Sequence, residues 1–242
     1  MKNPWFKNWF GETYRKLYPH RDLRQADAQV KSLLEALPVM PGWSILDVGC
    51  GSGRHLEMFQ QQGCSGIGLD LSPLLLREAR LGALTEVRGD MRHLPFRPAS
   101  FDLAACFFTS FGYFATLDED VQALAQFAGV LKPGGYFFLD LINKTHLLKN
   151  LVPRERCVLD GSPVEQYRRF EGGMVIKEIE IKRPDGQVEK FEERVRLYEE
   201  GELFALAERF SLRPLRVFGD ECGGAYQAET SLRMAALFQK DR

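Results

Sequence analysis

The 242-residue sequence predicts an α/β protein with a doubly wound, mostly parallel seven-stranded sheet and an antiparallel β insertion after the fifth strand. Between residues 22 and 142, short apolar runs alternate with amphipathic stretches, which is the order that βαβ crossovers produce. A glycine-rich loop follows the first apolar run and precedes a helix. After residue 143 the pattern changes to the two-residue alternation of antiparallel strands.

The elements of the parallel sheet follow from periodicity and from turn residues. Residues 22–37 form a predicted helix, because Val30, Leu33, Leu34 and Leu37 recur at helical spacing before Pro38. Strands are expected at residues 44–48, 66–69, 84–87, 101–108 and 136–142. Helices are expected at residues 54–62, 72–81 and 118–131. The uninterrupted apolar run at 101–108 is typical of a strand that is buried on both faces.

The rest of the chain predicts the insertion and the end of the sheet. Inserted strands are expected at 164–170, 174–181 and 188–198, with a turn at 183–186. A helix at 199–210 and strands at 215–218 and 232–238 complete the prediction. One domain is expected, divided into N-terminal cap helices (1–40), a cofactor-binding core (44–143), an insertion covering the substrate (154–198) and the C-terminal part of the core sheet (199–242).

Composition excludes several classes of protein. The formal net charge is -1, so the overall field does not favour binding to nucleic acid or to an anionic membrane. No apolar run is long enough to span a bilayer, and the N-terminus lacks the apolar core of a signal peptide. The five cysteines are widely spaced without a CxxC pair, which argues against disulfides and a metal site. A cytoplasmic protein is expected.

The segment Asp47-Val-Gly49-Cys-Gly51-Ser-Gly53 is the most informative motif. Glycines after a strand let a ligand approach the main chain, and the next helix presents free N–H groups. A dinucleotide site of the GxGxxG type would place glycine at position 54, where this chain has Arg54.

Two further acidic residues follow neighbouring predicted strands. Asp70 ends the second strand, where a carboxylate can accept hydrogen bonds from both hydroxyls of a ribose. Asp90 follows the third strand and could accept a hydrogen bond from an exocyclic amine such as that of adenine. Because these strand ends meet at one edge of the sheet, together they predict a nucleoside site.

These motifs resemble those of the class I S-adenosylmethionine (SAM) dependent methyltransferases, with a Rossmann-like fold. The matching segments are ILDVGCGSG (45–53), GLDLS (68–72), GDMRHLPF (89–96), FDLAACFF (101–108) and LKPGGYFFLDL (131–141). The resemblance implies that the three loop glycines line the methionine part of SAM, near which Asp47 meets the ammonium. It also implies that Asp70 binds the ribose. Around the adenine it places Leu71, Asp90, Met91 and the main-chain carbonyl of Phe107.

The resemblance further implies a small-molecule acceptor. The segment from Tyr14 to Asp22 is similar to the helix that caps the cofactor in small-molecule members. The Asn/Asp-Pro-Pro-Tyr/Phe motif of nucleobase and glutamine methyltransferases is absent after the fourth strand, where Thr109 to Phe114 stands instead. Tyr113 and His20 are candidate bases because both can transfer protons and are expected near the cleft.

The insertion offers candidate acceptor-binding residues. Arg194, Arg196 and Tyr198 share one face of the expected strand, and Glu193 lies on the other face. If the face with the two arginines is turned to the cleft, it could bind an anionic acceptor. Tyr14 on the cap is the further candidate for acceptor contact.

Three alternatives remain open from the sequence. The enzyme could methylate RNA or protein, although no basic domain is appended. The chain could also be a non-catalytic module that binds SAM or S-adenosylhomocysteine (SAH) without turnover. An NAD-linked dehydrogenase is the third alternative, and Arg54 argues against it.

Overall fold

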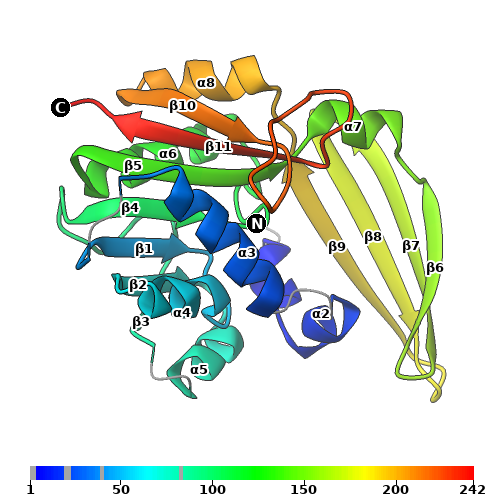
Figure 1. Ribbon diagram of the computed structural model, residues 1–242. Helices are drawn as coiled ribbons and strands as arrows, with labels where there is room; N and C mark the ends of the chain where they lie inside the picture. Colours follow the sequence, from blue (N-terminus) through cyan, green and yellow to red (C-terminus); the bar gives the residue numbers. More distant parts are fainter. Residues whose placement is uncertain (1–3, 19–22, 39–40, 82–83) are drawn as a thin grey trace.

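The computed structural model describes residues 4–18, 23–38, 41–81 and 84–242. A seven-stranded sheet with the order β10-β11-β5-β4-β1-β2-β3 forms its centre (Figure 1). Its strands are β1 (Ser44–Val48), β2 (Ser65–Asp70), β3 (Glu86–Arg88), β4 (Phe101–Cys106), β5 (Leu131–Ile142), β10 (Leu212–Phe218) and β11 (Arg233–Lys240). β11 runs antiparallel to both of its neighbours, whereas β1 to β5 pair in parallel. The predicted fold class is confirmed.

Helices cover both faces of this sheet, because its strands carry apolar side chains on both faces. The covering helices are α3 (Leu23–Glu35), α4 (Arg54–Gln61), α5 (Pro73–Leu81), α6 (Leu117–Val130) and α8 (Glu200–Glu208). Within β1, Ile45 belongs to the core cluster of α3 and α4, and Leu46 to the cluster of α6 and α8. Two-sided burial of consecutive residues is the physical basis of the doubly wound arrangement.

A cap and a second sheet stand against this core. The cap, residues 5–18, contains α1 (Phe6–Trp9) and α2 (Glu12–Leu17). After α7 (Lys144–Lys149), the second sheet consists of β6 (Arg154–Leu159), β7 (Ser162–Glu171), β8 (Met174–Lys182) and β9 (Val188–Arg196), all antiparallel. Figure 1 shows α2 between the core and this sheet. Trp9 of the cap packs into one apolar cluster with Ile179 and Ile181 of β8.

Three elements, α1, α7 and β6, were not expected from the sequence. Helices α1 and α7 have four and six residues, too short to show a periodic pattern. The segment RERCVL of β6 does not alternate, and its pairing with β7 defines it as a strand. One predicted strand is shorter than expected. β3 starts at Glu86, two residues later than predicted, and Leu84 is instead buried against Leu56 and Ala79. Within the described residues, no helix has the length and apolarity to cross a membrane.

Candidate active site

A cavity of about 320 Å³ lies at the carboxyl ends of β1, β2 and β4 and is covered by the cap. This is the edge of an open α/β sheet at which ligands bind. Residues of the core that line it are Gly49, Cys50, Gly51, Ser52, Arg54, His55, Leu69, Asp70, Leu71, Leu75, Glu78, Gly89, Met91, Phe107, Phe108, Ser110 and Tyr113. Residues of the cap that line it are Phe6, Phe10, Tyr14, Arg15 and Tyr18.

The glycine loop turns sharply into α4 on the floor of the cavity. Gly49, Gly51 and Gly53 all have positive φ, at 74°, 57° and 82°. A Cβ on Gly49 would lie 2.6 Å from the Cβ of Ser110, so glycine is required there by contact as well as by backbone angle. Gly53 does not line the cavity, because its α carbon faces Leu84 beneath the loop.

Asp70 at the end of β2 holds this loop from the neighbouring strand. Its carboxylate accepts a hydrogen bond from the Gly51 N–H at 2.9 Å and one from the Ser72 N–H at 2.7 Å. Burial raises the pKa of Asp70, although these backbone hydrogen bonds act in the opposite direction. Asp70 lines the cavity, and a carboxylate can accept further hydrogen bonds beside those from the backbone.

Asp47 is a buried carboxyl group at the end of β1. The side chain is 1% exposed, and its Oδ2 atom has no hydrogen-bond partner. Burial, followed by the charge of Asp70, raises the pKa of Asp47 to about 7, against a smaller opposing effect of Arg54. Asp47 is not among the residues that line the cavity, and it lies two residues before Gly49. A cation bound nearby would stabilise its ionised form.

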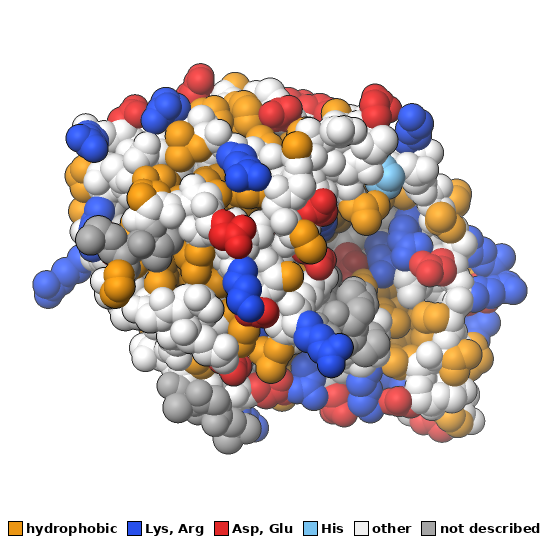
Figure 2. Space-filling model, viewed as in Figure 1, with side chains coloured by type: hydrophobic (Ala, Val, Ile, Leu, Met, Phe, Trp, Pro, Cys, Tyr) orange, Lys and Arg blue, Asp and Glu red, His pale blue; other side chains and the backbone are white. Residues whose placement is uncertain are grey.

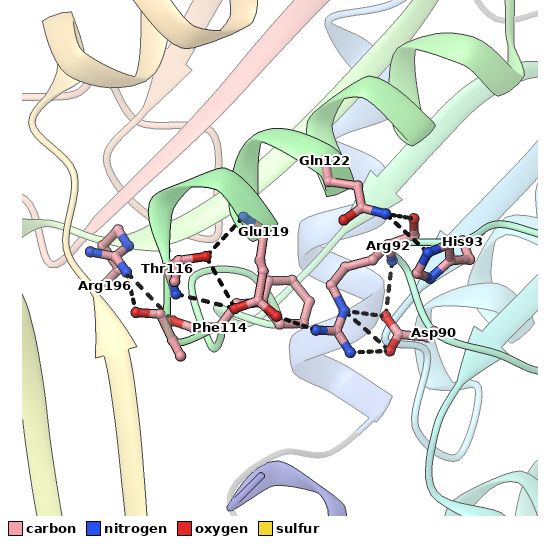
Figure 3. Close-up of polar contacts among 9 residues, drawn as sticks. Asp90, Arg92, His93, Phe114, Thr116, Glu119, Gln122 and Arg196 are labelled. Atoms are coloured by element: carbon pink, nitrogen blue, oxygen red, sulfur yellow. Dashed lines mark hydrogen bonds and ion pairs between the residues drawn. The ribbon is translucent and has the colours of Figure 1, made fainter. Parts of the chain in front are cut away.

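Leu71, Met91 and Phe107 line the cavity, but Asp90 does not. Both oxygens of Asp90 accept hydrogen bonds from Arg92, whose guanidinium also pairs with Glu119 of α6 at 2.5 Å (Figure 3). Burial would raise the pKa of Asp90, but these hydrogen bonds and the charge of Arg92 outweigh it, and the pKa is lowered. Asp90 was expected to bind a ligand amine, but Arg92 already occupies its carboxylate.

The cavity wall after β4 is a strained turn held by a buried ion pair. Phe108 and Thr109 have φ values of 53° and 59°, which non-glycine residues rarely adopt. The Phe108 N–H donates to Asp140 Oδ2 at 2.9 Å, and Arg233 pairs with Oδ1 of the same carboxylate at 2.7 Å. Arg233 also donates to the Thr109 hydroxyl at 2.9 Å. β5 and β11 thus fix the turn that presents Phe107, Phe108 and Ser110 to the cavity.

His55 at the start of α4 is buried beside this turn. Its ring stacks on Phe107 with centroids 3.9 Å apart, and its Nε2 atom lies 2.9 Å from the Gln29 amide oxygen. Burial, followed by the charge of Arg54, lowers the pKa of His55 well below its ordinary value. His55 is therefore a neutral imidazole at pH 7 that supports the wall.

The cap supplies an aromatic roof. Phe10 packs against Tyr14 and against Tyr113, with centroids 4.8 Å and 5.7 Å apart. Phe6 stacks on the same Tyr113 ring, which brings this predicted base candidate into the cavity wall. The expected acceptor contact Tyr14 also lines the cavity. The other base candidate, His20, lies outside the described residues.

Two contacts join the cap to the side of the cavity formed by β2 and α5. Arg15 of α2 pairs with Glu78 of α5, and both side chains line the cavity. The Ser72 hydroxyl donates to the Phe10 carbonyl at 2.8 Å. Phe6 and Phe10 were not expected at the cavity, and Arg15 and Tyr18 were expected only as part of the capping segment from Tyr14 to Asp22. An aromatic series could have indicated that the cap begins before Tyr14: Trp5, Phe6, Trp9, Phe10, Tyr14 and Tyr18.

The three residues expected to bind an anionic acceptor lie elsewhere. Arg196 Nε and the Tyr198 hydroxyl both donate to Oδ2 of Asp120, a carboxylate that is 0% exposed, at 2.8 Å and 2.6 Å. Arg196 also reaches the Phe114 carbonyl (Figure 3). Arg194 pairs with Glu192 on the face of β9 that is turned away from the cap. None of the three lines the cavity, because Glu193 and not its neighbours points to the cap.

Comparison with known proteins shows that part of the chain is similar to methyltransferases. Residues 46–139 match the family described as a methyltransferase domain. The chain is 43% identical over 95 residues to dTDP-3-amino-3,4,6-trideoxy-alpha-D-glucopyranose N,N-dimethyltransferase of Streptomyces venezuelae, covering 38% of this chain and 39% of that protein. It is 30% identical over 134 residues to ubiquinone biosynthesis O-methyltransferase of Xanthomonas campestris, covering 52% of this chain and 54% of that protein. The chain thus spans only about half, or less, of the length of these curated relatives.

The whole fold is found in solved structures. The CcbJ methyltransferase from Streptomyces caelestis superposes with a TM-score of 0.80 over 98% of this chain and 99% of that chain. At 16% identity this likeness concerns the fold, and it extends over the cap and the second sheet as well as the core. Residues 46–139 are thus similar to a methyltransferase domain, and the chain as a whole has the fold of the CcbJ methyltransferase.

Proposed function

We propose that this protein transfers the methyl group of SAM to a small-molecule acceptor in the cavity beneath the cap. The observation that carries the proposal is the two-part wall of that cavity. One part is the glycine loop held by Asp70, and the other is the aromatic roof of the cap. The small-molecule methyltransferases among the relatives support the same proposal.

The residues present fit SAM. Gly49 and Gly51 line the cavity, and without side chains they let a ligand approach the main chain. Asp70 faces the cavity as an acceptor for ribose hydroxyls, and Leu71 and Met91 offer apolar contacts for the adenine. The unpartnered Oδ2 atom of Asp47 fits the ammonium of the methionine part. Asp90 is left out of the proposed contacts because Arg92 occupies its carboxylate.

The acceptor is proposed to bind against the aromatic side chains of the cap and of the segment that follows β4. Phe6, Phe10, Tyr14, Tyr18 and Tyr113 line the cavity with aromatic rings. When bound, SAM supplies an electrophilic methyl group on its sulfonium. Transfer of this group in line to an acceptor depends mainly on alignment and on the exclusion of water. The hydroxyl of Tyr113 is the proposed group for moving a proton on the acceptor.

Calorimetric titration with SAM and with SAH tests the cofactor. We expect both to bind to the wild type and binding to be lost in Asp70→Ala, because this substitution removes the ribose acceptor and releases Gly51. Asp102→Ala is the matched control: Asp102 also accepts from a backbone N–H, that of Ser44 at 2.8 Å, at the opposite edge of the sheet. Absence of SAH binding to folded, ligand-free wild type would refute the proposal.

Formation of SAH from SAM with candidate amines and hydroxyl compounds tests the reaction itself. A Tyr113→Phe variant should keep SAH affinity while turnover falls, because only the proposed proton group is removed. SAH binding without turnover on any acceptor would instead favour the non-catalytic module. If the protein methylates RNA but none of the small molecules, this result would favour the nucleic-acid alternative.

We also propose that the protein acts in the cytoplasm. All five cysteines lie among the described residues as unpaired thiols, which supports a reducing compartment. Three of them, Cys50, Cys64 and Cys106, are buried in the core, where oxidation would disrupt packing. Fractionation of cells that produce the protein, followed by immunodetection, tests this location.

A further inference from the structure

A row of charged side chains crosses the face of the second sheet that is turned to the cap. Arg168 of β7, Lys177 of β8 and Glu193 of β9 are direct cross-strand neighbours. Lys177 is only 9% exposed, unusually buried for a lysine. Figure 2 shows the surface over this part of the sheet as a hollow in which Lys and Arg side chains gather among hydrophobic ones.

Glu193 joins this row to the cap. Its Oε1 atom accepts hydrogen bonds from the Trp9 indole N–H at 2.7 Å and from the Tyr18 hydroxyl at 2.8 Å. Lys177 Nζ donates to the same Tyr18 hydroxyl at 2.5 Å and lies 3.9 Å from Glu193 Oε2. A single carboxylate therefore binds the cap at two points, Trp9 at the end of α1 and Tyr18 after α2, and Lys177 fixes the orientation of the Tyr18 phenol.

The cap depends on such contacts because it has little stability of its own. Helices α1 and α2 have four and six residues, far below the length at which an isolated helix is stable. Trp9 also packs against Phe191 of β9, with centroids 4.7 Å apart, next to its hydrogen bond. On the other side, Arg15 binds Glu78 of α5. The cap is thus clamped between the core and the second sheet.

We infer that Glu193, supported by Lys177, is a positioning residue that holds the cap closed over the active-site cavity through Trp9 and Tyr18. This inference rests on the proposed function, because it concerns the same cavity. Tyr18 lines the cavity, whereas Glu193 and Lys177 lie behind it. They therefore act on the cavity through the cap residues that they hold.

Loosening this contact should speed the escape of a bound nucleoside product. Charge-assisted hydrogen bonds are the stronger kind, and two of them converge on one oxygen of Glu193. Glu193→Gln keeps an oxygen acceptor and removes the charge, and Tyr18→Phe removes the hydroxyl and keeps the ring. Because both variants weaken the contact between Glu193 and Tyr18, the effect of the double variant on SAH release should be smaller than the combined effects of the two single variants.

The test measures SAH dissociation by stopped-flow displacement and follows hydrogen exchange in residues 5–18 of the SAH complex. We expect each single variant to release SAH about tenfold faster, with faster exchange in the cap and unchanged exchange in the glycine loop. The matched control is Glu192→Gln, since Glu192 lies next to Glu193 on the opposite face and pairs with Arg194. This control should release SAH at the wild-type rate.

Different outcomes separate the two proposals. A lower melting temperature with an SAH release rate within about twofold of the wild type, in both single variants, would overturn the positioning role. Additive effects in the double variant would show that Glu193 does not act through Tyr18. Failure of the wild type itself to bind SAH would overturn the proposed function before any variant is compared.

Discussion

The Asp70 carboxylate accepts a hydrogen bond from the Gly51 N–H at 2.9 Å, so the end of β2 holds the loop that follows β1. The same carboxylate binds the Ser72 N–H at the start of the segment leading to α5. Two neighbouring strand-to-helix connections therefore meet on one side chain. The floor of the cavity is in this way held together by hydrogen bonds within the protein.

Gly49→Ala should weaken both folding and SAH binding. Its φ of 74° costs an alanine about 1–2 kcal/mol. The new Cβ would lie 2.6 Å from Ser110, which adds about 1–3 kcal/mol of overpacking. Gly63→Ala is the control, because Gly63 has a φ of 80° but no atom within 4 Å of its added Cβ. Chemical denaturation and SAH titration of both variants separate strain from collision; equal losses in the two would contradict the role of Ser110.

SAM affinity should rise with pH up to about pH 7. Burial and then the charge of Asp70 raise the pKa of Asp47 from 3.8 to about 7, so the carboxyl group is protonated in the ligand-free protein below that pH. An ammonium beside Asp47 favours the ionised form, and binding then releases a proton. The affinity gain is at most about tenfold per pH unit. Calorimetry in buffers of different ionisation enthalpy measures the released proton.

Asp47 also makes the stability of the folded protein depend on pH, in the direction opposite to SAM affinity. Because the folded pKa of Asp47 is raised, its favourable contribution is complete below pH 3.8 and is lost as pH rises to about 7. Asp47→Asn should remove this part of the pH dependence of unfolding and also abolish proton release on SAM binding. Proton release that persists in the variant would assign it to another group.

Arg233→Met should destabilise the protein by about 3 kcal/mol, because it leaves the buried Asp140 carboxylate without its cation. It should also weaken SAH binding, since Arg233 holds Thr109 in the strained turn beside Phe107 and Phe108. Arg213→Met is the control: Arg213 is an exposed side chain of β10 whose described hydrogen bond is to Gln239. Denaturation and SAH titration report the two effects, and unchanged SAH affinity in folded Arg233→Met would argue against support of the turn.

Tyr198→Phe should lower stability by about 2 kcal/mol and leave SAH affinity unchanged. The lost hydroxyl binds Asp120 Oδ2 at 2.6 Å, and Asp120 is fully buried away from the cavity. Urea unfolding and calorimetry provide the two values. A large loss of activity at unchanged stability would instead support the original expectation that Tyr198 binds the acceptor.

The core was predictable because two-sided burial and strand-end residues leave strong signals. The apolar run at 101–108 contains β4, and Asp70 and the glycine loop lie where their strands end. Local pairing was harder to see: Arg92, two residues after Asp90, occupies the carboxylate that was expected to meet the adenine. A carboxylate and a guanidinium at this spacing could have indicated that contact.

The acceptor side could not be predicted to the same depth. Alternation in β9 separates Glu193 from Arg194 and Arg196, but it does not say which face meets the cap. That choice depends on long-range contacts with Trp9 and Tyr18, which are 184 and 175 residues away in the chain. The short helices of the cap are likewise defined by what they pack against and not by their own periodicity.

The second sheet is a continuous length of chain, entering after β5 and leaving before α8. The glycine loop and Asp70 lie wholly outside it, in the segment between β1 and α5. Insertions or exchanges within residues 144–196 can therefore change the surface that supports the cap while the glycine loop and Asp70 keep their arrangement. A scaffold divided in this way can acquire new acceptors through changes in one contiguous stretch of its sequence.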